Sequence, residues 1–153
     1  MELTDLLKPC RVIPSLKGLT LRDIYSEMLS LITDKTVIKH RENILNELLE
    51  RENEVSSEIT NGIAVPHIRL GKLKNFEIVI GLSVKGIKHP SDGNKLYLFF
   101  LELAPRSENN KHIFLLAELA KLIETIDLKS LVDKQVTAEN LCCTLIELNN
   151  TLN

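Results

Sequence analysis

Hydrophobic residues recur at helical spacing in three segments of the chain, and two shorter helices are predicted after them. In the segment Val37–Glu52, Ile44 pairs with Leu48 and Leu45 with Leu49, which leaves the charged residues between them for water. The segment around Leu119 is apolar over most of its surface, as in a helix packed between other elements. The predicted helices cover Leu21–Ile32, Val37–Glu52, His112–Thr125, Leu128–Asp133 and, with Thr137 as N-cap, Thr137–Leu148.

Other segments have the pattern of strands. Phe76–Val84 alternates, with Val84 as the last residue of its inward face, and Leu96–Leu103 is apolar on both faces, as in a central strand. A turn over Lys88–Lys95 separates the two. Shorter strands are predicted at Ile63–Val65, which stops at Pro66, and at Cys10–Pro14, on an edge. Helices before and after a group of strands predict an α/β fold, a small mixed β-sheet flanked by helices on both faces.

Composition narrows the class of protein. The 153 residues suit a single domain, 1–153, with 44% hydrophobic and 26% charged residues, which is ordinary for a folded soluble protein. The net charge is −2 and basic residues are scattered, so nucleic-acid binding has no electrostatic support. No apolar run approaches the length of a membrane helix, and Met1–Pro9 lacks the pattern of a secretory signal. We therefore expect a cytoplasmic protein that is not inserted in a membrane.

Cysteines and glycines suggest no bound cofactor. Cys10, Cys142 and Cys143 are odd in number and two are adjacent, so they offer neither a disulfide framework nor a metal knuckle. We interpret them as buried small hydrophobic residues. A glycine-rich nucleotide-binding loop is also missing from the sequence.

Four histidines are candidates for chemistry. His40, on a polar helix face, and His89, in a turn, are interpreted as exposed surface residues. His67 follows Pro66 at the carboxyl end of a short strand, where side chains of α/β proteins open onto a crevice. His112 lies near the start of its helix, where backbone N–H groups favour an anion and disfavour a charged imidazole. Taken alone, a histidine after a proline is more often a structural turn residue than a functional one.

A longer string of motifs resembles a known family. Arg51-Glu52 is followed by Asn61-Gly62-Ile63-Ala64-Val65-Pro66-His67, and later by Asp92-Gly93, Ala104-Pro105 and a helix opening on His112-Ile113-Phe114. In order and spacing these segments resemble the enzyme IIA domains of the fructose–mannitol type from the bacterial phosphoenolpyruvate:sugar phosphotransferase system. The resemblance runs over nearly the whole chain.

This resemblance implies a mannitol-type enzyme IIA fold and a chemistry. His67 would accept a phosphoryl group from the phosphohistidine of the small carrier protein HPr or a paralogue. His112 would be the neighbouring histidine and Arg51 the basic residue close to the phosphate. Ser57 and Asn61 would take part in binding. The scheme requires no metal, and neither histidine has an acidic residue at metal-ligand spacing.

One segment departs from the family pattern. Where the family has a glycine-rich G-S-T-G-x-G, this chain has Val55-Ser56-Ser57-Glu58-Ile59-Thr60. The sequence therefore predicts a reshaped loop. It also leaves open whether Glu58 points into the phosphate site and repels the phosphoryl group or faces solvent.

Three functions are compatible with these residues. The free-standing chain favours a phospho-switch of the nitrogen-regulatory kind, which binds a regulatory target protein according to its phosphorylation state. The alternative is an enzyme IIA component that passes phosphate to a separate membrane permease subunit. A third interpretation, an interaction protein that has lost phosphorylation, rests on Glu58.

Overall fold

The computed structural model describes residues 1–152. Six strands form one mixed sheet, in the order β1-β5-β6-β3-β2, and β4 also pairs with β6. The strands are β1 (Val12–Ile13), β2 (Glu58–Thr60), β3 (Ile63–Ala64), β4 (His67–Leu70), β5 (Glu77–Lys88) and β6 (Lys95–Pro105). The helices are α1 (Leu3–Leu6), the 3₁₀ turn η1 (Pro9–Arg11), α2 (Leu21–Leu29), α3 (Lys35–Lys39), α4 (Arg41–Glu54), α5 (Asn109–Glu124), α6 (Leu128–Asp133) and α7 (Ala138–Thr151).

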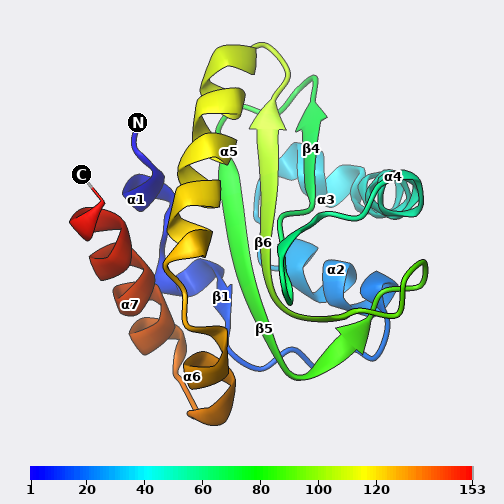
Figure 1. Cartoon of the computed structure of the whole chain (residues 1–153). Coiled ribbons are helices and arrows are strands. Elements are labelled where there is room, and N and C mark those ends of the chain that lie inside the picture. The colour runs from blue at the N-terminus through cyan, green and yellow to red at the C-terminus, as the bar shows by residue number, and fades with distance from the viewer. Residues whose placement is uncertain (153) are drawn as a thin grey trace.

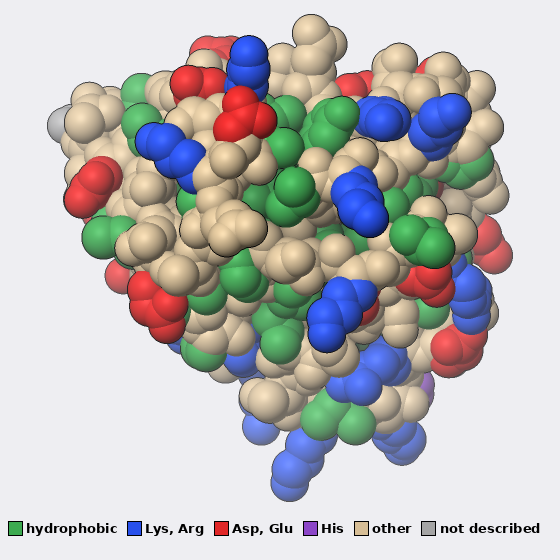
Figure 2. All heavy atoms as spheres, turned by 90° about the horizontal axis from the view of Figure 1, so that it is seen from below, with side chains coloured by type: hydrophobic (Ala, Val, Ile, Leu, Met, Phe, Trp, Pro, Cys, Tyr) green, Lys and Arg blue, Asp and Glu red, His purple; other side chains and the backbone are tan. Residues whose placement is uncertain are grey.

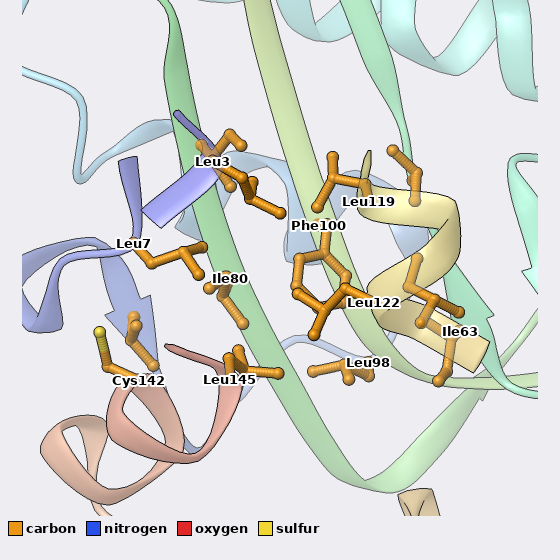
Figure 3. Packing of buried hydrophobic residues seen from close by; sticks show 14 of the residues in the cluster. Leu3, Leu7, Ile63, Ile80, Leu98, Phe100, Leu119, Leu122, Cys142 and Leu145 are labelled. Carbon is orange, nitrogen blue, oxygen red and sulfur yellow. The ribbon is translucent and has the colours of Figure 1, made fainter. Parts of the chain in front are cut away.

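Helices cover both faces of the sheet, which confirms the predicted fold class. Helices α1, α5, α6 and α7 lie on one face, and α2, α3 and α4 lie on the other (Figure 1). Alternation along the strands divides the core accordingly: Ile80 and Phe100 pack under α5 and α7 (Figure 3), whereas Val79 and Phe99 pack under α2 and α4.

Strand β6 is central because it pairs along both edges. On one edge it forms a long antiparallel ladder with β5. On the other edge it pairs in parallel first with β3 and then with β4, and Pro66 lies in the gap between these two strands. The predicted strand does end before Pro66, at Ala64, but the sequence analysis did not predict β4, which begins at His67. Proline interrupts the ladder only locally, since Pro66 still accepts a hydrogen bond from Glu102 N at 3.0 Å.

Several other boundaries also differ from the prediction. The segment predicted as one helix from Val37 is two helices, which meet at His40, and α5 begins three residues before His112. Strand β5 continues past Val84, whose side chain is 46% exposed rather than buried. The edge strand is confirmed only at β1, preceded by η1, and Thr137 caps α7 as expected by accepting from the backbone N–H of Asn140.

Three further features of the chain are the polarity of its helices, the distribution of charge on its surface and the exposure of its cysteines. No helix within residues 1–152 is long and apolar enough to cross a membrane. On the face shown in Figure 2, basic side chains are separated by polar and hydrophobic atoms. Cys142 is buried as expected, but Cys10 and Cys143 are exposed, because Cys10 belongs to η1 and Cys143 lies on the outer face of α7; all three are free thiols.

Glycine is required where β5 bulges against β6. Gly86 has φ +80°, and a Cβ there would lie 2.7 Å from Cε1 of Tyr97. Gly93, in the hairpin turn, has φ +73°, but a Cβ there would contact nothing. We expect Gly86→Ala to lower the free energy of unfolding by about 3 kcal/mol, because backbone strain and overpacking add. Gly93→Ala should lose only about 1 kcal/mol. Urea unfolding of both variants measures this, and equal losses would show that the Tyr97 contact is unimportant.

Candidate active site

His67 is held at the first position of β4. The strand register places it opposite Glu102 of β6. Its Nδ1 lies 2.8 Å from the carbonyl oxygen of Val65, which can only accept a hydrogen bond. Nδ1 therefore carries the proton, and Nε2 keeps its lone pair. The ring is half-buried, so the break at Pro66 presents one nucleophilic nitrogen to the surface.

Arg51 lies beside the imidazole of His67. It belongs to the last turn of α4, and its Nη1 donates to the carbonyl oxygen of His67 at 3.4 Å. A pocket opens here between the end of α4, residues 55–57, Pro66 and His67. The Arg51 side chain is exposed, so its remaining N–H groups can meet an anion in this pocket.

His112 completes the histidine pair. It lies in the first turn of α5, with its ring centroid 5.7 Å from that of His67 and the ring planes tilted by 49°. Burial lowers the pKa of His112, and the nearby His67, Arg69 and Arg51 lower it further. The imidazole is therefore neutral near pH 7, as the helix-start argument from the sequence requires.

Glu102 was missed by the sequence analysis. This residue of β6 has no exposed side-chain surface, and its two oxygens lie 2.9 and 3.0 Å from Nδ1 of His112. Burial raises the pKa of Glu102 to about 8. An acidic residue in the middle of an otherwise apolar central strand is rare, and that was the available signal.

A second buried acid, Glu52, organises the opposite wall of the pocket. Its carboxylate accepts from the backbone N–H and the hydroxyl of Ser57, at 2.9 and 3.1 Å. It also accepts from the Tyr25 hydroxyl at 3.0 Å, and burial and Glu52 raise the pKa of that hydroxyl. His89 Nε2 is the fourth partner, at 2.8 Å. The network joins α2, α4, the 55–57 segment and the β5–β6 hairpin.

The position of His89 corrects the prediction of an exposed residue. Its side chain is 1% exposed, because the hairpin turn folds the ring inward onto Glu52. Its Nδ1 accepts from the backbone N–H of Ser91 at 3.1 Å, so Nε2 carries the proton that Glu52 accepts. His40 is exposed, as expected.

The structure does not bring all the predicted binding residues together. Ser57 lines the pocket, next to Arg51 and His67. Asn61 lies exposed on the turn before β3 and does not line the pocket. Glu58 accepts from the backbone N–H of Gly62 at 2.9 Å and from Asn94 Nδ2 at 3.3 Å, which directs its carboxylate into the β2–β3 turn rather than into the pocket.

The described part of the chain offers no metal centre of the usual kind. Within residues 1–152, no group of three or more His, Cys, Asp and Glu side chains is placed to hold a metal ion. The chemistry available from these residues is that of an imidazole nucleophile with a guanidinium beside it.

Comparisons with known proteins show the family of the chain. Residues 5–147 match the family "Phosphoenolpyruvate-dependent sugar phosphotransferase system, EIIA 2". The chain therefore belongs to this family of phosphotransferase-system components, as the motifs around His67 indicated. A nitrogen regulatory protein of Bradyrhizobium diazoefficiens is 30% identical over 133 residues, which are 84% of each chain.

Two further proteins resemble the chain in different ways, one in sequence and one in fold. The fructose-specific EIIABC component of Bacillus subtilis is 27% identical over 80% of this chain, but the chain spans only 20% of that protein's length. The crystal structure of nitrogen regulatory protein IIA-Ntr from Neisseria meningitidis has the same fold. The two structures superpose with a TM-score of 0.80 at 19% sequence identity. The superposition covers 94% of this chain and 98% of the Neisseria meningitidis chain.

Glu102 predicts a pH dependence of stability. In the unfolded chain it titrates near 4.5, whereas folding raises its pKa to about 8, so between these values the folded protein holds the extra proton. Stability therefore falls as pH rises through this window, by about 1.5 kcal/mol between pH 6.5 and 8. Above pH 6.5 the lowered pKa of His112 adds little to this slope.

Urea unfolding of the wild type and Glu102→Gln across this window measures the effect. We expect the difference in the free energy of unfolding between the two proteins to change with pH by the same amount. Glu124→Gln, at the exposed far end of α5, serves as control and should keep the slope of the wild type. If the free energy of unfolding of Glu102→Gln changes with pH as that of the wild type does, Glu102 is already ionised at pH 6.5.

Proposed function

We propose that the chain is a histidine phosphocarrier, which accepts a phosphoryl group on Nε2 of His67. The observation that carries the proposal is the hydrogen bond from Nδ1 of His67 to the Val65 carbonyl, because it leaves Nε2 as the unprotonated atom. Arg51 and Ser57 line the pocket beside that ring.

The transfer requires little covalent work from the protein. The donor is the phosphohistidine of an HPr-like carrier protein. Its phosphorus–nitrogen bond breaks as the bond from His67 Nε2 to phosphorus forms. The electron pair returns to the donor imidazole, which takes up a proton from solvent, while His67 keeps its Nδ1 proton. Positioning of the two rings and stabilisation of charge by Arg51 supply the catalysis.

A regulatory phospho-switch is the role that we favour. The nitrogen regulatory protein of B. diazoefficiens is 30% identical over 84% of this chain, against 27% over 80% for the fructose-specific component. In this role the phosphorylated and unphosphorylated forms differ in affinity for a target protein in the cytoplasm. Transfer to a separate permease subunit is the alternative, supported by the fructose-specific relative.

The interpretation as a phosphorylation-deficient protein loses its main support. It rested on repulsion by Glu58, but this carboxylate is engaged by the backbone N–H of Gly62 and the amide of Asn94. Its negative charge is therefore partly neutralised by donors and directed away from the Arg51 pocket.

Covalent labelling tests the site directly. Incubation with phosphoenolpyruvate, the first enzyme of the system and HPr should add one acid-labile phosphate, detected by intact-protein mass spectrometry. His67→Ala should abolish the label and keep the circular dichroism spectrum, since the ring is only half-buried. His40→Ala, at an exposed histidine outside the pocket, should label like the wild type. A label that persists in His67→Ala would place the reacting residue elsewhere.

Two substitutions of Arg51 separate the effect of its charge from the effect of its planar geometry. We expect Arg51→Ala to slow phosphorylation by HPr about 100-fold, because one charged donor to the transferring group is lost. Arg51→Lys should recover only part of the rate, since an ammonium cannot form a bidentate pair. Single-turnover rates measure both, with Arg22→Ala as control, because Arg22 pairs with Glu42 and does not line the pocket. Three equal rates would show that Arg51 is structural.

A further inference from the structure

The buried Glu102–His112 pair lies directly behind the reacting histidine. Glu102 lies opposite His67 in the register of β4 and β6, and His112 lies against His67 from α5. Because Nδ1 of His112 is turned toward Glu102, Nε2, across the ring, is the nitrogen left for the site. Glu102 therefore controls whether Nδ1 or Nε2 of His112 carries the proton, although Glu102 itself does not line the pocket.

The surroundings of Glu102 favour a protonated carboxyl. Oε2 forms the hydrogen bond to His112; Oε1 lies 2.9 Å from the same Nδ1 but meets no hydrogen-bond geometry, and within residues 1–152 it has no other donor. A carboxylate would leave a buried, charged oxygen without a donor, whereas a carboxylic acid leaves only a carbonyl oxygen unpaired.

The neighbouring groups do not supply the missing donor. On the other side of β6, β5 presents apolar Ile78 to Glu102 in the register. From β4 and α4, the groups that act electrostatically on this pair are His67, Arg69 and Arg51, and they act on His112. The raised pKa of Glu102 and the lowered pKa of His112 agree with a neutral acid beside a neutral imidazole.

We propose that Glu102 is a positioning residue that stores a proton for His112. In the resting protein the Glu102 O–H donates to Nδ1 of His112, so that the proton of His112 is on Nε2, where it can be donated to a phosphoryl group. This inference rests on the proposed phosphorylation of His67.

Phosphorylation moves the stored proton. A phosphoryl group on His67 brings about two negative charges to within a few ångströms of His112 and raises its affinity for a proton by about one to three pH units. The O–H bond of Glu102 then breaks and an N–H bond forms at Nδ1, while the Nε2–H bond is kept. His112 becomes an imidazolium and Glu102 a carboxylate, so the pair stays neutral overall and takes no proton from solvent.

The protonation of His112 can be read directly by NMR. In ¹⁵N-labelled wild-type protein at pH 7, long-range ¹H–¹⁵N spectra should show the Nε2–H tautomer of His112. The tautomer should change to Nδ1–H near pH 8, as Glu102 ionises and becomes an acceptor. After phosphorylation of His67, both nitrogens of His112 should have the shifts of an imidazolium at pH 7.

A variant tests the stored proton. Glu102→Gln keeps the shape and a hydrogen bond to Nδ1, but an amide cannot release a proton. We expect His112 to stay neutral at pH 7 after phosphorylation, and phospho-His67 to hydrolyse several-fold faster than in the wild type. Glu124→Gln, the matched control at the exposed end of α5, should behave like the wild type.

The outcomes separate this inference from the proposed function. An Nδ1–H tautomer or an imidazolium in the unphosphorylated wild type at pH 7 would overturn the assignment of the proton, with no variant required. A phosphorylated wild type whose His112 remains neutral would overturn the proton shift. If the wild type accepts no phosphate at all, the proposed function and the proton shift both fail, while the resting tautomer still decides where the proton is stored.

Discussion

The pairing of β6 with two successive strands along one edge determines where His67, the proposed phosphorylation site, lies. Because β3 and β4 both run parallel to β6, the chain must pass Pro66 without leaving the sheet, and the ladder resumes at His67. The interruption frees the Val65 carbonyl from the ladder to accept from the imidazole two residues later. The same strand, β6, contributes Glu102, so one register positions both the His67 ring and the acid that contacts His112.

Two buried acids flank this register, and their surroundings differ. Glu52 accepts hydrogen bonds from four donor atoms of three residues, Tyr25, Ser57 and His89. Glu102 has one partner and an unpaired oxygen, which favours the neutral acid. Burial raises the pKa of Glu102 to about 8, and few donors surround this carboxyl group to offset that effect.

Local patterns in the sequence were sufficient for the layers but not for the contacts between them. The periodicity of the helices and the apolar run of β6 predicted a mixed sheet covered on both faces, and the motif around His67 predicted the family. The burial of His89 could not be predicted, because its polar neighbours are typical of an exposed turn and its partner, Glu52, is 37 residues away. The His112–Glu102 contact likewise joins a helix start to a strand interior, which no periodicity encodes.

The segment that lacks the family's glycines shows how the site tolerates the change. Residues 58–60 form the extended strand β2, paired with β3, and no residue other than glycine among residues 1–152 has a positive φ. Glycine is thus not needed there. The rearrangement has a consequence for anion binding, because the backbone N–H of Ser57 is taken by Glu52 and that of Glu58 by the Ser56 hydroxyl. With these donors engaged internally, the proposed phosphoryl group on His67 would depend on side-chain donors, Arg51 from α4 and His112 from α5.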